Sequence, residues 1–112
     1  MTRKELKEQY KNRKIIGGVY VIKNTGTDKI LLCSTTDIKG SINWFSFAKQ
    51  TNSCVDLALQ KDWNRYGSEQ FTFEVLEELE KEDSQTDSDF KKSLDILKEI
   101  WFEKLEGNDF YK

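Results

Sequence analysis

A chain of 112 residues, of which 37% are hydrophobic, can build one domain around a single core but not two. Its formal net charge of −2 lacks the basic excess of a general nucleic-acid-binding protein, and its two cysteines are too few for a disulfide scaffold. The absence of histidine removes the commonest general base and transition-metal ligand. Because no stretch is apolar enough for a signal peptide or a membrane span, we predict a single cytoplasmic domain, residues 1–112, with no membrane partner.

Residues 1–14 are predicted to form a basic N-terminal helix. Thr2 and Glu5 have the spacing of a capping box, and the segment holds six Lys or Arg residues against two Glu. Leu6 and Tyr10 lie one helical turn apart, so they either dock the helix on the core or leave it to fray. The basic residues could contact phosphate, although a solvated charged face is the favoured interpretation.

The segment from Gly18 to Ser34 predicts a β-hairpin. Its two runs, GVYVIKN and KILLCS, are rich in β-branched and aromatic residues, and NTGTDK at their junction supplies Asn, Gly and Asp for a tight turn. Asp37 is then placed to cap a helix over residues 38–50, although Gly40 weakens the start of that helix.

The second half of the chain predicts two helices and a strand. A helix over residues 54–67 places Trp63 on its apolar face and Gly67 at its end, where a left-handed residue is favoured. The alternation in QFTFEVLEEL predicts a strand over residues 70–79, followed by an acidic loop over residues 80–89. Residues 89–105 predict a final helix with Trp101 on its core face. The predicted order is α-β-β-α-α-β-α, an α+β fold with helices flanking a small three-stranded antiparallel or mixed sheet.

The chain resembles the GIY-YIG nuclease family in two main stretches, and STTDIKGSI at residues 34–42 and the final helix with Trp101 continue the resemblance. In GVYVIKNTGTDKILLCS, residues 18–20 match the family's first triplet, and residues 31–33 stand where the second would be. The run LQKDWNRYGSEQFTFEVLEELE, residues 59–80, is more specific and is similar to small bacterial members. The resemblance implies a GIY-YIG fold over about residues 15–105. It also implies a chemistry in which a glutamate holds one divalent cation, Mg²⁺ or Mn²⁺, while tyrosines and an arginine help to cleave a DNA phosphodiester.

Carried over position by position, most of the family's functional residues are replaced. The first tyrosine matches Tyr20, whereas the second falls on Leu31 and the arginine falls on Ser41. A common histidine falls on Phe45, and the metal-binding glutamate falls on Lys98. An ammonium group cannot ligate a divalent cation and would repel it. We therefore predict no complete catalytic set, no metal ligand and no cofactor.

The leading hypothesis is a GIY-YIG-like domain that has lost cleavage and acts as a pseudoenzyme, binding DNA weakly or binding a protein partner. Its nucleic-acid-binding candidates are Tyr20, Lys23, Lys39 and Ser41. A contact surface for a protein is predicted at Trp44, Phe45 and Phe47. Three rings so close together cannot all face inward from one helix, so at least one should be exposed.

Two alternatives to the leading hypothesis stay open. An active DNA endonuclease would use a relocated site made from Tyr20, Lys39 and either Asp95 or Glu99, and it would need Mg²⁺ or Mn²⁺. A protein-interaction module with no nucleic-acid role agrees with the near-neutral charge. Salt-dependent binding to DNA would separate this last class from the leading one.

Overall fold

The computed structural model describes residues 15–53 and 57–111. The described elements are β1 (Ile16–Asn24), β2 (Ile30–Thr35), α2 (Ile38–Thr51), α3 (Leu57–Tyr66), the short 3₁₀ helix η1 (Ser68–Gln70), β3 (Phe71–Glu80) and α4 (Asp87–Lys104). This order agrees with the predicted one from the hairpin onward. The predicted basic helix over residues 1–14 and the predicted helix start at residues 54–56 lie outside the described residues.

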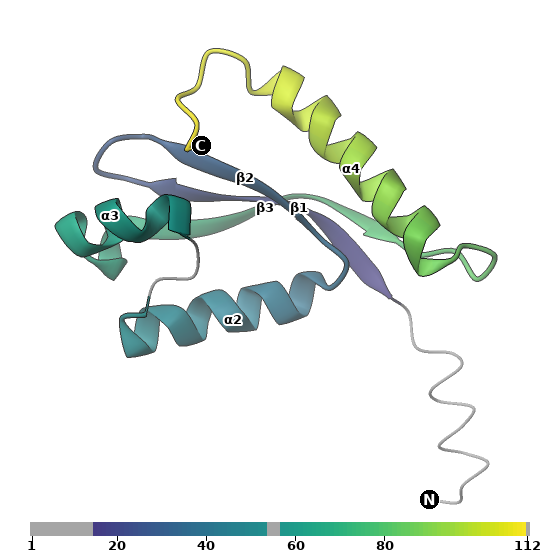
Figure 1. Cartoon of the computed structure of the whole chain (residues 1–112), viewed down its shortest axis with the longest axis horizontal. Coiled ribbons are helices and arrows are strands. Elements are labelled where there is room, and N and C mark those ends of the chain that lie inside the picture. Colours follow the sequence, from purple (N-terminus) through teal and green to yellow (C-terminus); the bar gives the residue numbers. More distant parts are fainter. Residues whose placement is uncertain (1–14, 54–56, 112) are drawn as a thin grey trace, which may run out of the picture.

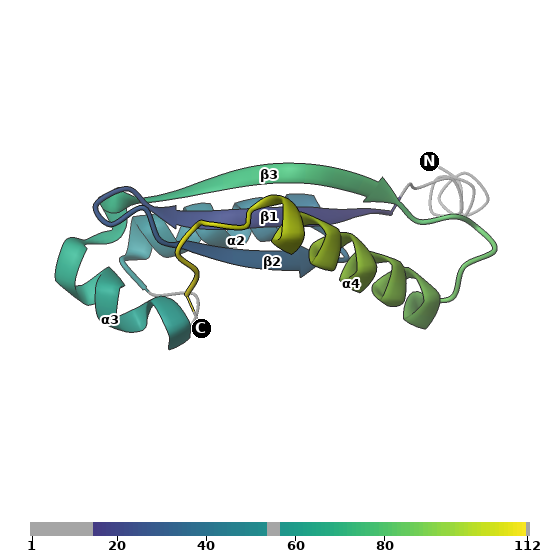
Figure 2. The same ribbon diagram turned by 90° about the horizontal axis from the view of Figure 1, so that it is seen from above.

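The three strands form one antiparallel sheet in the order β2-β1-β3, which places β1 at its centre. α2 and α3 cover one face of this sheet and α4 covers the other (Figure 1, Figure 2). Because both of its faces are covered, β1 is buried along most of its length. The predicted α+β fold is thus confirmed, with strands that are all antiparallel. Among the described helices, none has the length and apolar character needed to cross a membrane.

The sheet separates two hydrophobic clusters, since successive side chains of a strand point to opposite faces. The cluster on the side of α2 and α3, called here the α2-face cluster, has the buried members Tyr20, Ile22, Ile38, Phe45, Ala48, Leu59, Trp63 and Phe71. The cluster beneath α4, called here the α4-face cluster, has the buried members Val19, Val21, Ile30 and Leu32. Adjacent residues of β1 therefore belong to different clusters.

The two tryptophans predicted to lie in the core have different surroundings. Trp63 is 2% exposed, as predicted. Trp101 is only partly buried against the α4-face cluster, so its predicted place in the core needs correction. Its Nε1 donates a 3.1 Å hydrogen bond to the Glu77 carboxylate, and the Lys104 ammonium lies 4.7 Å from its ring centroid. These charged neighbours stay solvated, so Trp101 lies at the boundary of the core.

The starts of two helices are fixed by side-chain caps. The Asp37 carboxylate accepts a 3.1 Å hydrogen bond from the Gly40 amide, which confirms the predicted cap of α2. A Cβ atom at Gly40 would lie 2.3 Å from Asp37 Oδ2, so glycine makes room for the cap that starts the helix. α4 begins at Asp87 because Thr86 and Asp89 form a capping box. The predicted acidic loop over residues 80–89 was therefore too long, and the loop itself covers residues 81–86.

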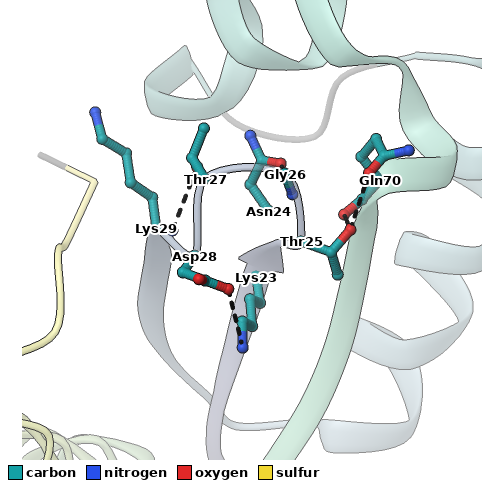
Figure 3. A network of polar contacts seen from close by, with 8 residues as sticks. All are labelled: Lys23, Asn24, Thr25, Gly26, Thr27, Asp28, Lys29 and Gln70. Carbon is teal, nitrogen blue, oxygen red and sulfur yellow. Dashed lines mark hydrogen bonds and ion pairs between the residues drawn. The ribbon is translucent and has the colours of Figure 1, made fainter.

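The hairpin turn is held by its own polar groups (Figure 3). Asn24 is fully buried, and its Oδ1 accepts a 2.9 Å hydrogen bond from the Gly26 amide. Thr25 Oγ1 reaches the carbonyl of Gln70 at 2.9 Å and so joins the turn to η1. Lys23 forms a 3.5 Å ion pair with Asp28, whose φ of 63° is left-handed. The turn predicted from NTGTDK is thus confirmed.

Candidate functional site

Tyr20, the retained family tyrosine, lies in the α2-face cluster. Its side chain is 7% exposed, and its ring stacks on Phe73 of β3 with centroids 4.3 Å apart and an interplanar angle of 21°. The stacking follows from register, because Tyr20 and its neighbour Ile22 face the same side of the sheet as Phe73. Most of the Tyr20 surface is therefore used in packing.

Leu31 and Phe45, at the positions of the second tyrosine and the histidine, belong to the same apolar environment. Leu31 packs against the α2-face cluster from β2. Phe45 is 5% exposed, and its ring lies 5.4 Å from Phe73 and meets Trp63 edge-on at 6.4 Å. The predicted contact surface thus cannot include Phe45. The Phe45 ring points from α2 into the α2-face cluster.

Ser41, at the position of the arginine, takes part in the structure that starts α2. Its hydroxyl donates a 2.8 Å hydrogen bond to Thr35 Oγ1, and the same Thr35 oxygen accepts from the Asp37 amide at 3.1 Å. These bonds join the end of β2 to the first turn of α2. Ser41 therefore has a structural role in the turn between β2 and α2. It lacks the planar, positively charged guanidinium group with which arginine binds phosphate.

Lys98, at the position of the metal-binding glutamate, projects from α4, which packs on the other face of the sheet. It lines a groove between α4 and β2, where Asp95 and Glu99 are its neighbours along the helix. Three of the five matched positions thus lie together in the α2-face cluster, while Lys98 lies across the sheet from them. Residues 15–53 and 57–111 hold no group of three or more His, Cys, Asp or Glu side chains arranged to bind a metal ion.

Comparison with solved structures finds the same arrangement of strands and helices in a nuclease domain. The catalytic domain of intron endonuclease I-TevI, in a mutant form, matches with a TM-score of 0.57 and 23% identity over 81% of this chain and 84% of that chain. The catalytic domain of homing endonuclease I-TevI matches with a TM-score of 0.52 and 22% identity over 85% and 95% of the two chains. This chain has a GIY-YIG-like fold. No protein-family model and no curated protein matches the sequence.

At this level of identity the likeness establishes the fold, and the chemistry of the GIY-YIG-like domain depends on its own residues. The resemblance places the Lys98 ammonium where the family has a carboxylate ligand, and an ammonium group does not bind a divalent cation. Asp95 and Glu99 lie three residues before and one residue after it on an exposed helix face. Of the residues named for a relocated site, Tyr20 lies on β1 and faces α2, whereas both acids belong to α4.

Among the predicted nucleic-acid contacts, Lys39 is the one with an exposed side chain outside the hairpin. Lys23 is engaged with Asp28, Ser41 with Thr35, and Tyr20 with Phe73. A single exposed lysine provides little phosphate-binding free energy. Among these four candidates, Lys39 is therefore the exposed cation that is not paired with a carboxylate in the described part of the chain.

Trp44 and Phe47 form an exposed aromatic pair on α2, called here the α2 ridge. Trp44 is 45% exposed and Phe47 is 64% exposed, whereas Phe45 between them is buried. They lie three residues apart, so their side chains lie near each other on the solvent side of the helix. The prediction that at least one ring of the cluster is exposed is confirmed for these two rings.

The C-terminal segment adds a partly buried polar network that the sequence did not suggest. The Tyr111 hydroxyl donates a 2.7 Å hydrogen bond to Asp62 Oδ2 and accepts a 3.1 Å hydrogen bond from Asn24 Nδ2. The network joins α3, the hairpin turn and the C-terminal segment. Burial raises the pKa of Tyr111 above its ordinary value of 10.0, and the hydrogen bond to Asp62 raises the pKa further.

The raised pKa of Tyr111 predicts a loss of stability at high pH. A folded-state pKa above the unfolded value means that the stabilising contribution is complete below pH 10.0 and is lost as pH rises through the folded-state pKa. We expect the free energy of unfolding, measured by urea denaturation at pH values on both sides of 10.0, to fall more steeply in the wild type than in Tyr111→Phe. Parallel profiles for the two proteins would contradict this prediction.

Proposed function

We propose that this GIY-YIG-like domain has lost phosphodiester cleavage and acts by binding. The observation that carries the proposal is Lys98, which the resemblance places where the family holds its metal with a glutamate. A cationic side chain there opposes metal binding, and a leucine and a serine replace the second hydroxyl and the arginine. Removing one electrostatic contact from a transition state commonly costs about 10²- to 10³-fold in rate, so several such losses leave little activity.

The proposal predicts no nicking of supercoiled plasmid DNA above the protein-free background with either Mg²⁺ or Mn²⁺. Tyr20→Phe is the matched control, because it keeps the ring that stacks on Phe73 and removes only the hydroxyl. Metal-dependent nicking by the wild type that disappears in Tyr20→Phe would establish the active-endonuclease alternative and overturn the proposal. Nicking that persists in Tyr20→Phe would indicate a contaminating nuclease.

The α2 ridge supports a protein partner as the second candidate ligand, beside nucleic acid. Two exposed aromatic side chains on one helix are typical of interface anchors, and the exposed lysine Lys39 alone is a weak phosphate contact. Titrating a fluorescently labelled DNA duplex with the protein at several salt concentrations distinguishes a nucleic-acid ligand from a protein partner. Salt-dependent binding would favour nucleic acid, and its absence would favour a protein partner in the predicted cytoplasmic setting.

A further inference from the structure

A groove of about 620 Å³ lies between the C-terminal half of α4, strand β2 and the C-terminal segment. Leu32, Phe102 and Phe110 give it an apolar floor, with the rings of Phe102 and Phe110 at a centroid distance of 4.9 Å. Phe102 is 56% exposed, so the floor is open to solvent. The volume falls within the range of about 300–1,000 Å³ that is typical of ligand-binding sites.

The α4 side of the groove carries a row of carboxylates. Asp95, Glu99 and Glu103 all line the groove, with Lys98 as the basic residue among the lining side chains. Their spacing of four residues puts them on one side of the helix at steps of about 6 Å. This charge would repel a phosphate backbone, and it is complementary to a row of Lys or Arg side chains.

The β2 side of the groove offers an open sheet edge. The Ile30 amide donates to the Asp109 carbonyl at 2.9 Å, and the Tyr111 amide donates to the Ile30 carbonyl at 2.8 Å, so the main chain of Ile30 faces away from β1. Main-chain direction alternates along a strand, which turns Leu32 and Ser34 toward the same side. Within residues 15–53 and 57–111, no main-chain hydrogen bond is made to Leu32 or Ser34 on that side.

We propose that this groove binds an extended basic segment of a partner protein. The segment adds to the outer edge of β2 through main-chain hydrogen bonds to Leu32 and Ser34, which is an established mode of peptide recognition. Alternate side chains of an extended strand repeat at about 6.6–6.8 Å, close to the step between the carboxylates of α4. Lys or Arg side chains on the α4 side of the segment then meet Asp95, Glu99 and Glu103, and their aliphatic stems cover Phe102 and Phe110, which line the same groove.

This inference rests on the proposed function and deepens it, because it names a ligand class for the groove that also contains Lys98. The probe is a capped synthetic peptide of alternating Lys and Val, titrated into the full chain and followed by two-dimensional amide NMR. We expect shifts at the groove residues and amide exchange at Leu32 and Ser34 slowed at least about tenfold at saturation. Affinity should fall as salt is raised.

Two matched comparisons test the charge contacts and the main-chain hydrogen bonds separately. Glu99→Lys should weaken peptide binding by about tenfold or more, whereas Glu74→Lys, the same charge change at an exposed residue of β3, should leave it within about twofold. A peptide N-methylated at alternate residues keeps its charges but loses half of its amide donors, and it should also bind at least about tenfold more weakly.

Three results would overturn the proposal. The first is equal binding of the N-methylated peptide, or of a peptide alternating Glu and Val. The second is a pattern of shifts confined to the α2 ridge. The third is groove signals that shift with protein concentration alone, which would assign the groove to a second copy of this chain. A nuclease assay reports on none of these, so failure here and failure of the proposed function are distinguishable.

Discussion

Replacing Trp63 by alanine is expected to lower the free energy of unfolding by about 3–5 kcal/mol. Trp63 is 2% exposed, stacks on Phe71 with centroids 5.0 Å apart, and meets Phe45 edge-on. Its removal would leave a cavity that three elements of the α2-face cluster share. Small domains have only about 5–15 kcal/mol of stability, so the variant should unfold at a much lower urea concentration when followed by far-ultraviolet circular dichroism.

Trp44→Ala is the matched control for Trp63→Ala, because it removes the same side chain from the exposed α2 ridge. We expect it to change the free energy of unfolding by less than about 1 kcal/mol. Trp63→Phe gives a second comparison. Within the described residues, Trp63 Nε1 is buried without a hydrogen-bond partner, so phenylalanine keeps much of the packing and removes an unsatisfied donor. Equal decreases in the free energy of unfolding for Trp63→Ala and Trp44→Ala would contradict the placement of Trp63 in the core.

Replacing Gly18 by alanine should cost about 1–3 kcal/mol of stability through overpacking. A Cβ atom at Gly18 would lie 2.4 Å from the main-chain oxygen of Glu77 on β3. That oxygen belongs to a neighbouring strand and cannot rotate away as a side chain would. The pairing of β1 with β3 shifts register between Val19 and Tyr20, right beside this contact. The strands must therefore separate locally to accept the methyl group.

Gly26→Ala is the control for Gly18→Ala, since Gly26 lies in the exposed hairpin turn. A Cβ atom there would lie 3.2 Å from the Asn24 side chain and 3.4 Å from the Tyr66 ring, so small side-chain shifts suffice. We expect a change of less than about 1 kcal/mol in the same urea experiment. A loss from Gly26→Ala that matched the loss from Gly18→Ala would show that the contact with Glu77 is not the cause. The close approach of the Glu77 oxygen is a structural reason for glycine at position 18.

The parts of the fold that the sequence predicted are those set by local patterns. Alternation identified β3, the polar turn residues identified the hairpin, and Asp37 identified the start of α2. The capping box at Thr86 and Asp89 was missed, although its spacing is visible in the sequence. It was hidden within an acidic stretch that has the composition of a solvated loop.

The parts that the sequence did not predict depend on contacts between distant segments. Helical spacing could not choose between Trp44, Phe45 and Phe47 as the buried ring, because the choice is made by packing against Phe73 and Trp63. The groove brings together residue 32, residues 95–103 and residues 110–111. The sequence shows that acidic residues recur every four positions in α4, at Asp95, Glu99 and Glu103. No local pattern shows that an open strand edge lies beside them.

The placement of adjacent β1 residues in different clusters has a consequence for how the chain tolerates substitution. Free-energy changes add when two sites are separated and share no packing partner, and they couple when they do. Trp63 belongs to the α2-face cluster and Leu32 belongs to the α4-face cluster, with the sheet between them. Substitutions on the two faces should therefore be close to additive. One face can change its side chains without forcing compensating changes on the other, so the fold is compatible with very different surfaces on its two sides.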